Sequence, residues 1–481
     1  MTAGPRTGLR VRRLSLAVTA EQVFDTLYQH SIFAFWLDSS NSAGMAAGLG
    51  RFSFLGDAAG PLARVVRADV WSGRIRIDSA GGSRTITSGF FDWLENDLAT
   101  HEQVTSDLPF GFSLGWVGYL GYELKAECDG ARAHRSPDPD AFLIFADRGV
   151  VVDHHTGDVH LLALAPPGDP DAAEAWLSET ECRLRVAATR SVGPPGAAVV
   201  RMGRARPRHD RARYLAMIEE CRTAIGQGES YEICLTNQVS VPAALDVWPA
   251  YRALRRDNPV PFGALLRLGE LSVLSTSPER FLSISAAGEV ESRPIKGTRP
   301  RGATPELDAL LRKELATSEK DRAENLMIVD LVRNDLGSCA EVGSVHVPTL
   351  FGVESYASVH QLVSTIRARL RPDCSPVRCV RAAFPGGSMT GAPKIRTMEI
   401  LDELEAGPRG VYSGAIGYFS LSGAVDLSIV IRTLVVRPES ASFGVGGAII
   451  ASSDPAEEFE ETAVKATPMA GLLGLEFPGR P

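Results

Sequence analysis

Lys296 lies in the run Arg-Pro-Ile-Lys-Gly-Thr (293–298), where a proline-led strand end meets a Gly-Thr turn. A lysine at such a place can present its amine to a pocket. The amine acts as a nucleophile only when it is neutral, so a catalytic role predicts a pKa that burial or neighbouring cations depress. The residue types alone leave many roles open.

Glu279 lies in the run Ser-Pro-Glu-Arg-Phe (277–281), directly after the apolar strand expected over 271–274. A carboxyl group just past a strand end could act as a general acid if burial raised its pKa. A surface turn with a Glu–Arg ion pair explains the same residues, so the motif does not decide between the two.

The stretch 319–337 has apolar residues at helical spacing, and Asp321 and Glu324 fall three positions apart on another face. Paired acids on one helical face suit Mg²⁺, which prefers one or two carboxylates together with water and substrate oxygens. Solvated surface acids have the same spacing, and that alternative stays open.

A second acidic helix is expected after Asp454, which is followed by Pro455 at the first helical position. Glu458, Glu461 and Lys465 then recur at i, i+3 and i+7, so they share one stripe. Two acids and a lysine on one stripe suit a metal ion with an anionic ligand. A salt-bridged surface helix would look the same.

Two glycine-rich segments could expose backbone N–H groups to an anion. Residues 384–396 (FPGGSMTGAPKIR) include Ser388 ahead of an expected helix, and residues 445–448 read Val-Gly-Gly-Ala. Neither is a P-loop, because Gly-Lys-Ser/Thr is missing. The second segment could equally be a strand crowded against its neighbour.

The elements that must position these residues fall into three ranges. Residues 9–165 show short strands and helices with frequent glycine, including a hairpin over 150–164. Residues 166–208 contain one amphipathic helix and a Pro/Gly/Arg-rich linker. Residues 209–475 begin with a helix near an Asp210 cap, alternate strands and helices, and carry the dense motifs.

Composition excludes several classes of protein. The net charge of −8 over 481 residues argues against nucleic acid as the main partner. The seven cysteines are scattered without a Cys-x-x-Cys pair, which indicates reduced thiols and a cytoplasmic location. No apolar run is long enough to predict a membrane span, and the run 10–20 is too short and polar for a secretory leader.

Together, the motifs resemble those of the chorismate-binding enzymes. In chain order they are SPERF, RPIKGT, KDRAENLMIVDLVRNDLG, SYASVHQLVSTI, FPGGSMTGAPKIR, GVYSGAIGYF, DLSIVIRT and VGGAIIASSDPAEEFEETAVKA, within residues 210–475. The N-terminal half is similar more weakly, through Leu37-Asp38-Ser39 and the segments 50–56 and 118–123. The resemblance implies an α/β (α+β) fold with a two-sheet β-sandwich core flanked by helices, like anthranilate synthase component I.

The resemblance also implies a role for each candidate residue. Glu279 would protonate the departing C4 hydroxyl of chorismate, and His360 would face that hydroxyl or the ring. Glu324, Glu458 and Glu461 would hold Mg²⁺, which would bind the ring carboxylate and offset the desolvation of a dianion. The residues expected to position the substrate are Thr298, Ser388, Tyr412, Arg432, Gly447, Ala448 and Lys465. Relatives often have glycine where this chain has Ala448.

Lys296 bears on the outcome of the reaction. In this family a lysine here is typical of aminodeoxychorismate synthase component I, and an alanine of anthranilate synthase. The lysine would attack C2 as the C4 hydroxyl leaves, and ammonia would then attack C4 to give 4-amino-4-deoxychorismate for p-aminobenzoate and folate synthesis. Isochorismate and salicylate synthases carry a water-activating lysine where this chain has Glu232, which favours an enzyme that uses ammonia.

The resemblance implies a partner and a second binding site. The Gly-x-Cys-x-Gly and His-x-Glu motifs of related glutaminases are absent from the sequence, so ammonia is expected from a separate glutamine amidotransferase subunit. Leu37, Asp38 and Ser39 resemble the tryptophan-binding part of the family and could hold tryptophan or only pack in the core.

Two alternatives remain. The chain could be an anthranilate synthase component I with an unusual lysine, or a non-catalytic relative that only binds a ligand or partner. Retention of all the expected catalytic and metal-binding side chains argues against the second. Whether the product serves folate or a specialised pathway stays open.

Overall fold

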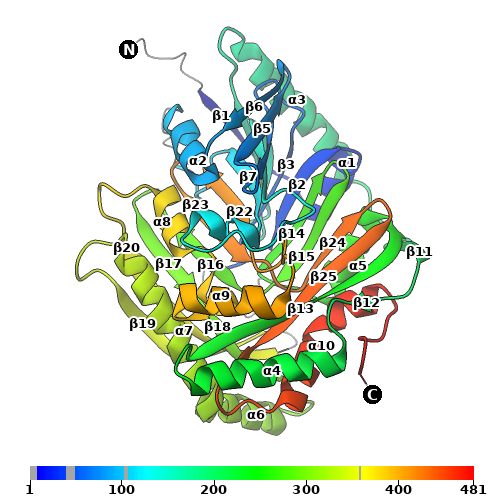
Figure 1. Ribbon diagram of the computed structural model, residues 1–481. Helices are drawn as coiled ribbons and strands as arrows, with labels where there is room; N and C mark the ends of the chain where they lie inside the picture. Colours follow the sequence, from blue (N-terminus) through cyan, green and yellow to red (C-terminus); the bar gives the residue numbers. More distant parts are fainter. Residues whose placement is uncertain (1–7, 40–48, 102–103, 105–106, 357–358, 481) are drawn as a thin grey trace.

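The computed structural model describes residues 8–39, 49–101, 104, 107–356 and 359–480 (Figure 1). In this part of the chain, one sheet has 13 strands and the other has 12, and the paired strands are antiparallel. Helices pack on the outside of the sheets. The predicted α/β fold, a two-sheet core flanked by helices, is confirmed.

The first sheet has the order β1-β10-β9-β3-β2-β14-β15-β24-β25-β13-β11, and β12 and β21 also pair with β13. Its strands are β1 (Leu9–Ser15), β2 (Phe33–Asp38), β3 (Phe52–Asp57), β9 (Arg148–Asp153), β10 (Asp158–Leu164), β11 (Val199–Met202), β12 (Arg206–Pro207), β13 (Glu232–Leu245), β14 (Phe262–Leu268), β15 (Leu271–Ser277), β21 (Gly391–Ala392), β24 (Thr433–Arg437) and β25 (Ser440–Ile449).

The second sheet has the order β18-β20-β17-β16-β23-β22-β7-β8-β4-β5-β6, and β19 also pairs with β20. Its strands are β4 (Arg64–Asp69), β5 (Arg74–Ser79), β6 (Gly82–Thr87), β7 (Gly115–Leu120), β8 (Ala141–Ala146), β16 (Arg280–Ile284), β17 (Glu289–Arg293), β18 (Ile295–Pro300), β19 (His346–Ser355), β20 (Val359–Arg369), β22 (Ala415–Ser420) and β23 (Val425–Ile429).

The helices connect and cover these strands. They are α1 (Ala20–Leu27), α2 (Phe90–Ala99), α3 (Pro170–Ala187), α4 (Arg211–Gly226), α5 (Val247–Asp257), α6 (Pro305–Thr317), α7 (Glu319–Gly337), α8 (Pro376–Ala383), α9 (Lys394–Glu405) and α10 (Pro455–Leu472), with short 3₁₀ turns at Tyr122–Glu127 and Gly387–Met389.

The period-two alternation of strand residues divides the core in two. On β2, Phe35 lies opposite Leu266 of β14, and the ring of Phe33, on the same face, lies 6.3 Å from that of Phe142 on β8, so this face of β2 meets the second sheet. The next residue, Trp36, lies opposite Leu265 and packs with buried residues of α1 and α5 on the other face. Successive residues of one strand therefore fix both the sheet–sheet and the sheet–helix interface.

Strands from both ends of the chain share each sheet. In the first sheet β2 pairs with β14, and in the second β7 pairs with β22. Figure 1 shows the blue and cyan N-terminal strands continuing into sheets with green and orange ones. The ranges 9–165 and 209–475 are therefore joined by hydrogen-bonded strand pairs, and the three-part division, with 166–208 between them, stays a prediction.

A side-chain cap begins each of the two site helices, and the one at Asp454 was expected from the sequence. Asp454 accepts hydrogen bonds from the backbone N–H groups of Ala456 and Glu457, with Pro455 at the first position of α10. The side chain of Ser318 accepts from the N–H of Asp321 and begins α7. The structure confirms the helix predicted over 319–337 from its apolar spacing and the one predicted after Asp454 from its cap.

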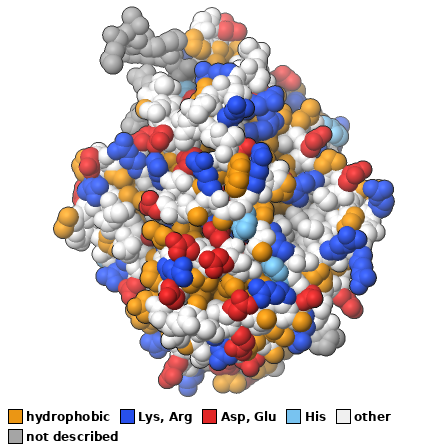
Figure 2. All heavy atoms as spheres, viewed as in Figure 1, with side chains coloured by type: hydrophobic (Ala, Val, Ile, Leu, Met, Phe, Trp, Pro, Cys, Tyr) orange, Lys and Arg blue, Asp and Glu red, His pale blue; other side chains and the backbone are white. Residues whose placement is uncertain are grey.

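None of the described helices is long and apolar enough to cross a membrane. On the face shown in Figure 2, Lys and Arg side chains are interspersed with Asp and Glu rather than separated by sign. This distribution agrees with the modest negative net charge. The expectation that nucleic acid is not the main partner remains a prediction.

Candidate active site

Lys296 lies on β18, and its side chain is only 10% exposed. Its ammonium donates a hydrogen bond of 2.6 Å to the Oε1 atom of Glu232, at the start of β13. The next residue, Gly297, has φ +85°, and a Cβ there would lie 2.7 Å from the Asp321 carboxyl carbon on α7. Glycine is therefore required for β18 to approach α7 this closely.

The charge state of Lys296 differs from the expectation. Burial by itself lowers the pKa of Lys296, but the negative charges of Glu232 and Glu324 outweigh it and raise that pKa above its ordinary value. The prediction of a depressed pKa, made from the sequence, is wrong for the protein without ligands. The sequence could not show that two acids would face this amine.

Glu279 lies between β15 and β16 and is 5% exposed. Burial raises the pKa of Glu279 to about 7, against a hydrogen bond from Ser388 and the positive charges of Lys296 and Lys465. A carboxyl group with this pKa is partly protonated near neutral pH and can donate a proton. The structure thus brings the Ser388 hydroxyl and the ammonium groups of Lys296 and Lys465 close enough to Glu279 to act on its pKa.

Acids of α7 and α10 meet across Lys320. The Lys320 ammonium lies 3.0 Å from Oε1 of Glu458 and 4.0 Å from Oε1 of Glu324. Glu458 also accepts a 2.7 Å hydrogen bond from the Ser453 hydroxyl. Burial, helped by the negative charge of Glu232, raises the pKa of Glu324 to about 7 against the opposing positive charges of Lys296 and Lys320.

The glycine segment of β25 faces the same acids. A Cβ on Gly447 would lie 3.4 Å from Oε2 of Glu458 and 3.9 Å from both Oε1 of Glu461 and Nζ of Lys465. Lys465 forms a 2.7 Å ion pair with Glu461 and donates to the Gly446 carbonyl at 3.1 Å. The ion pair holds the pKa of Glu461 below its ordinary value. The stripe predicted on α10 therefore faces Gly447.

Among the described residues, no three His, Cys, Asp or Glu side chains already form a metal-binding group. The donor types nevertheless fit a hard divalent cation, because Glu324, Glu458 and Glu461 offer carboxylate oxygens only. The ammonium of Lys320 lies between two of these acids, where it neutralises them as a cation would. Sequence analysis missed Lys320, although its i, i+4 spacing to Glu324 could have indicated it.

His360 is fully buried on β20, and both ring nitrogens have protein partners. Its Nδ1 atom lies 2.8 Å from the Ser355 hydroxyl, and Nε2 lies 3.0 Å from the Asp308 carboxylate on α6. Asp308 also accepts hydrogen bonds from Arg301. In this arrangement His360 ties α6 to β20, and its expected contact with the leaving hydroxyl or the ring stays a prediction.

The other expected substrate-binding residues lie at different depths. Tyr412 is buried against Gly444 of β25. Arg432 is buried enough that its pKa is lowered, although the charge of Glu279 opposes this. Ala448 lies opposite Cys234, two residues beyond Glu232 on β13. Thr298, by contrast, is exposed on β18.

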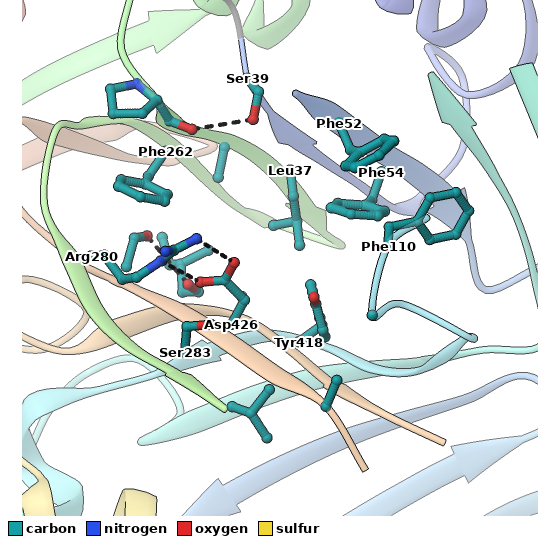
Figure 3. A pocket seen from close by; sticks show the side chains of 18 of the residues that line it. Leu37, Ser39, Phe52, Phe54, Phe110, Phe262, Arg280, Ser283, Tyr418 and Asp426 are labelled. Carbon is teal, nitrogen blue, oxygen red and sulfur yellow. Dashed lines mark hydrogen bonds and ion pairs between the residues drawn. The ribbon is translucent and has the colours of Figure 1, made fainter. Parts of the chain in front are cut away.

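Away from these residues, a second candidate site is a cavity of about 290 Å³ that lies between the two sheets (Figure 3). Its volume is close to the lower limit of the roughly 300–1,000 Å³ that is typical of small-molecule binding sites. Leu37, Ser39, Phe54 and Tyr418 line it, and Figure 3 shows Leu37 and Phe54 pointing toward its centre. The Arg280–Asp426 ion pair crosses one wall, with contacts of 3.0 and 3.1 Å.

Asp38 also lines this cavity, but its carboxylate is occupied. It accepts a 2.7 Å hydrogen bond from Arg255, and a 3.3 Å one from the Tyr251 hydroxyl. The side chain of Asp38 is fully buried. The predicted Leu37-Asp38-Ser39 segment thus borders a ligand-sized space, while Asp38 itself anchors α5.

Comparisons with known proteins agree with this architecture. Residues 65–471 match the family model described as chorismate binding enzyme. The chain is 59% identical over 482 residues to the aminodeoxychorismate synthase of Streptomyces griseus. That alignment covers 100% of this chain and 66% of the Streptomyces protein. It is 42% identical over 351 residues to aminodeoxychorismate synthase component 1 of Klebsiella aerogenes, covering 72% and 74%.

A solved structure supports the fold. The crystal structure of anthranilate synthase component I from Streptococcus pneumoniae has a TM-score of 0.75 and 29% identity, over 87% of this chain and 92% of that one. The chain belongs to the chorismate binding enzyme family, as its motifs predicted. It spans slightly less than two thirds of the length of the Streptomyces griseus relative.

The raised pKa of Glu279 predicts a pH-dependent stability. In the folded protein the pKa of Glu279 is about 7, whereas its ordinary value, expected in the unfolded chain, is 4.5. The folded state therefore binds this proton more tightly than the unfolded state does. The resulting contribution to the free energy of unfolding is complete below pH 4.5 and is lost as the pH rises through about 7. Glu279→Gln cannot ionise. We expect the variant to be more stable than the unmodified protein by about 1–3 kcal/mol near pH 8.5, and the difference to disappear near pH 4.5.

Urea denaturation at both pH values measures this difference. Glu457→Gln is the matched control, because Glu457 is exposed on the first turn of α10. Equal pH dependence in Glu279→Gln and the unmodified protein would contradict the raised pKa.

Proposed function

We propose that this chain catalyses the amination of chorismate at C4, which forms 4-amino-4-deoxychorismate from chorismate and ammonia. The observation that carries the proposal is Lys296, buried in ion-pair contact with Glu232 and close to the charges of Glu279 and Glu324. The relatives named aminodeoxychorismate synthase support the same reaction.

In the proposed reaction the amine of Lys296 attacks C2 of chorismate, and the C4 hydroxyl leaves as water with a proton from Glu279. The pKa of about 7 suits Glu279 to this donation at neutral pH. Ammonia then forms a bond to C4, and the bond between C2 and the lysine nitrogen breaks. The ammonium group formed at C4 gives one proton to Glu279, and the proton that Lys296 lost before its attack returns to the lysine nitrogen, so the net reaction converts chorismate and ammonia to 4-amino-4-deoxychorismate and water.

Mg²⁺ would be held by Glu324, Glu458 and Glu461. When bound, it would neutralise a carboxylate of the substrate. The chain's own part is to present carboxylate oxygens from α7 and α10, and the Lys320 ammonium would have to leave its place between Glu324 and Glu458. Lys320 on this view is an internal counter-ion of the site without substrate.

The remaining contacts would orient a dianionic substrate. Lys465 and Arg432 supply positive charge, and Ser388 supplies a hydroxyl that already interacts with Glu279. The backbone of Gly447 lies beside the acids of α10 and can approach the substrate closely because it has no side chain. The proposed substrate-contacting residues also include Tyr412, Ala448, Thr298 and His360.

Ammonia in this proposal comes from a glutamine amidotransferase, with which the chain assembles. The name of the Klebsiella aerogenes relative, component 1, implies such a second component for that protein. We further propose that the protein acts in the cytoplasm, in p-aminobenzoate and folate synthesis, without nucleic acid or membrane as a partner.

The leading alternative is C2 amination with loss of pyruvate, as an anthranilate synthase component I. The structural similarity to such a protein favours neither branch, because both would share the fold. The lysine at position 296, where an alanine is typical of anthranilate synthases, supports C4 amination.

Lys296→Arg tests the proposed nucleophile. Arginine keeps a positive charge beside Glu232 but has no amine that becomes neutral, so the fold is retained while covalent attack is lost. We expect the formation of aminodeoxychorismate from chorismate, Mg²⁺ and an ammonium salt to fall by roughly 10³-fold or more. Products are identified by mass and fluorescence.

Lys313→Arg is the control for that experiment, since Lys313 is exposed on α6. Unchanged turnover in Lys296→Arg would remove the lysine from the mechanism. Anthranilate as the main product of the unmodified protein would instead support the alternative branch.

Glu461→Gln tests the proposed Mg²⁺ site without relying on turnover. Loss of one of three carboxylates is expected to weaken Mg²⁺ binding by about 10-fold or more, measured by calorimetric titration of the metal-stripped protein. Glu460→Gln, one position away on α10 and paired with Arg480 rather than with the site, is the control. Equal Mg²⁺ affinity in both variants would argue against this ligand set.

The second cavity is proposed to bind tryptophan through Leu37, Asp38 and Ser39. Leu37→Ala should weaken tryptophan binding about 10-fold, because one buried aliphatic contact with the indole is lost. Calorimetric titration with tryptophan measures this, with the exposed Leu350→Ala as control. If the unmodified protein takes up no tryptophan, the segment only packs in the core.

A further inference from the structure

Glu232 is the most enclosed acid near Lys296. Its side chain is 1% exposed, and its Oε1 atom accepts the 2.6 Å hydrogen bond from Lys296. Its other oxygen, Oε2, is buried and has no hydrogen-bond partner within the described ranges. Buried carboxylate oxygens rarely lack a donor, so this one calls for an explanation in terms of function.

The backbone holds Glu232 firmly in this place. Glu232 begins β13 and pairs with Ala392 of β21, while Ile233 pairs with both Gly391 and Ile449. Gly391 has φ +141°, and a Cβ there would lie 1.9 Å from the carbonyl oxygen of Glu232. Two neighbouring strands therefore fix the backbone at the start of β13, from which the Glu232 side chain reaches Lys296.

Charged groups from several elements surround this pair. The negative charges of Cys234 on β13 and Glu324 on α7 act on the pKa of Lys296. The charge of Lys296 acts in turn on the pKa values of Cys234, of Glu279 in the β15–β16 turn and of Glu461 on α10. The charge of Lys465 on α10 acts on those of Cys234 and Glu279. Within the part of the chain that the structure describes, only Glu232 lies in ion-pair distance of the Lys296 ammonium.

We propose that Glu232 positions Lys296 and receives its proton, which generates the neutral amine that attacks the substrate. The inference deepens the proposed function and rests on it. In the step, an N–H bond of Lys296 breaks as an O–H bond forms on Glu232, and the freed electron pair forms the bond to C2. When the amine later leaves C2, the same proton returns from Glu232 to the lysine nitrogen.

The geometry suits this transfer in two ways. The short contact between Nζ and Oε1 lets the proton move without a bridging water. The partnerless Oε2 leaves part of the negative charge of Glu232 unstabilised by hydrogen bonds, and protonation would remove that charge. The pair thus stores the lysine as an ammonium ion and can release it as an amine.

Glu232→Gln separates this role from a merely structural one. Glutamine keeps the size and one acceptor but cannot take up the proton. We expect kcat for aminodeoxychorismate formation to fall by roughly 10²–10⁴-fold, with little change in KM for chorismate. Glu232→Asp, which restores an acid on a shorter side chain, should recover part of the loss and give a shifted pH profile.

A second measurement needs no turnover. Reductive methylation of the full chain near pH 8, followed by peptide mass spectrometry, reports how much of Lys296 is neutral. Removal of the Glu232 charge should speed methylation of Lys296 about 10-fold or more, as a fall of one pKa unit would. Asp402→Asn, which breaks the equally buried pair with Lys125, is the matched control and should change neither kcat nor Lys296 methylation by this amount.

The outcomes are distinct. Faster methylation together with a large loss of kcat supports the inference. Unchanged methylation of Lys296 in Glu232→Gln overturns it, and so does faster methylation with kcat and pH profile unchanged, because Glu232 would then hold the lysine without accepting its proton. If the unmodified protein forms no aminodeoxychorismate, the proposed function is wrong and the role of Glu232 falls with it.

Discussion

The buried contact between Lys296 and Glu232 is the constraint on which the candidate site depends. Charges removed from water destabilise a fold unless they are paired, and the cost of leaving one partner alone exceeds the gain from the pair. Lys296 pairs with Glu232, Lys320 with Glu458 and Lys465 with Glu461. Each lysine of the site therefore has one close acid of its own.

Two acids remain outside this one-to-one pairing. Among the described residues, Glu324 forms an ion pair only with the shared Lys320, at 4.0 Å, and Glu279 is hydrogen-bonded to Ser388, while Lys296 and Lys465 act on it as charges. Both have a pKa raised to about 7. The two acids that lack a lysine of their own therefore bind a proton more strongly than an ordinary glutamate does. Glu279 lies where the proposed reaction needs a proton donor, and Glu324 lies where the proposed Mg²⁺ would replace the proton. One imbalance of charge serves both proposals.

Much of this could be predicted from the sequence because its causes are local. The cap at Asp454 and the helical spacing of Glu458, Glu461 and Lys465 are properties of one short segment, and the structure confirms the helix. The two-sheet fold followed from the family resemblance. The order of strands could not be foreseen, because the pairing of β2 with β14 joins segments separated by more than two hundred residues.

Some of the interactions that sequence analysis missed join distant segments. The partner of Lys320 at 3.0 Å, Glu458, lies on another helix, and the contact of His360 with Asp308 depends on how α6 lies against β20. No local pattern distinguishes such pairs from solvated surface charges. The residue types that a site needs were therefore predictable, while their partners were not.

The charge on Lys296 is the clearest consequence. Burial alone would make this amine neutral, and the sequence offered no reason to expect otherwise. The structure places it against Glu232 and near Glu324, and their negative charges favour the ammonium ion. A nucleophilic lysine in such a site cannot be activated by desolvation alone. It needs an acceptor for its proton, and Glu232 lies at hydrogen-bond distance with one oxygen unoccupied by the described residues. In the proposed mechanism, the activation of Lys296 as a nucleophile therefore depends on the residue that begins β13.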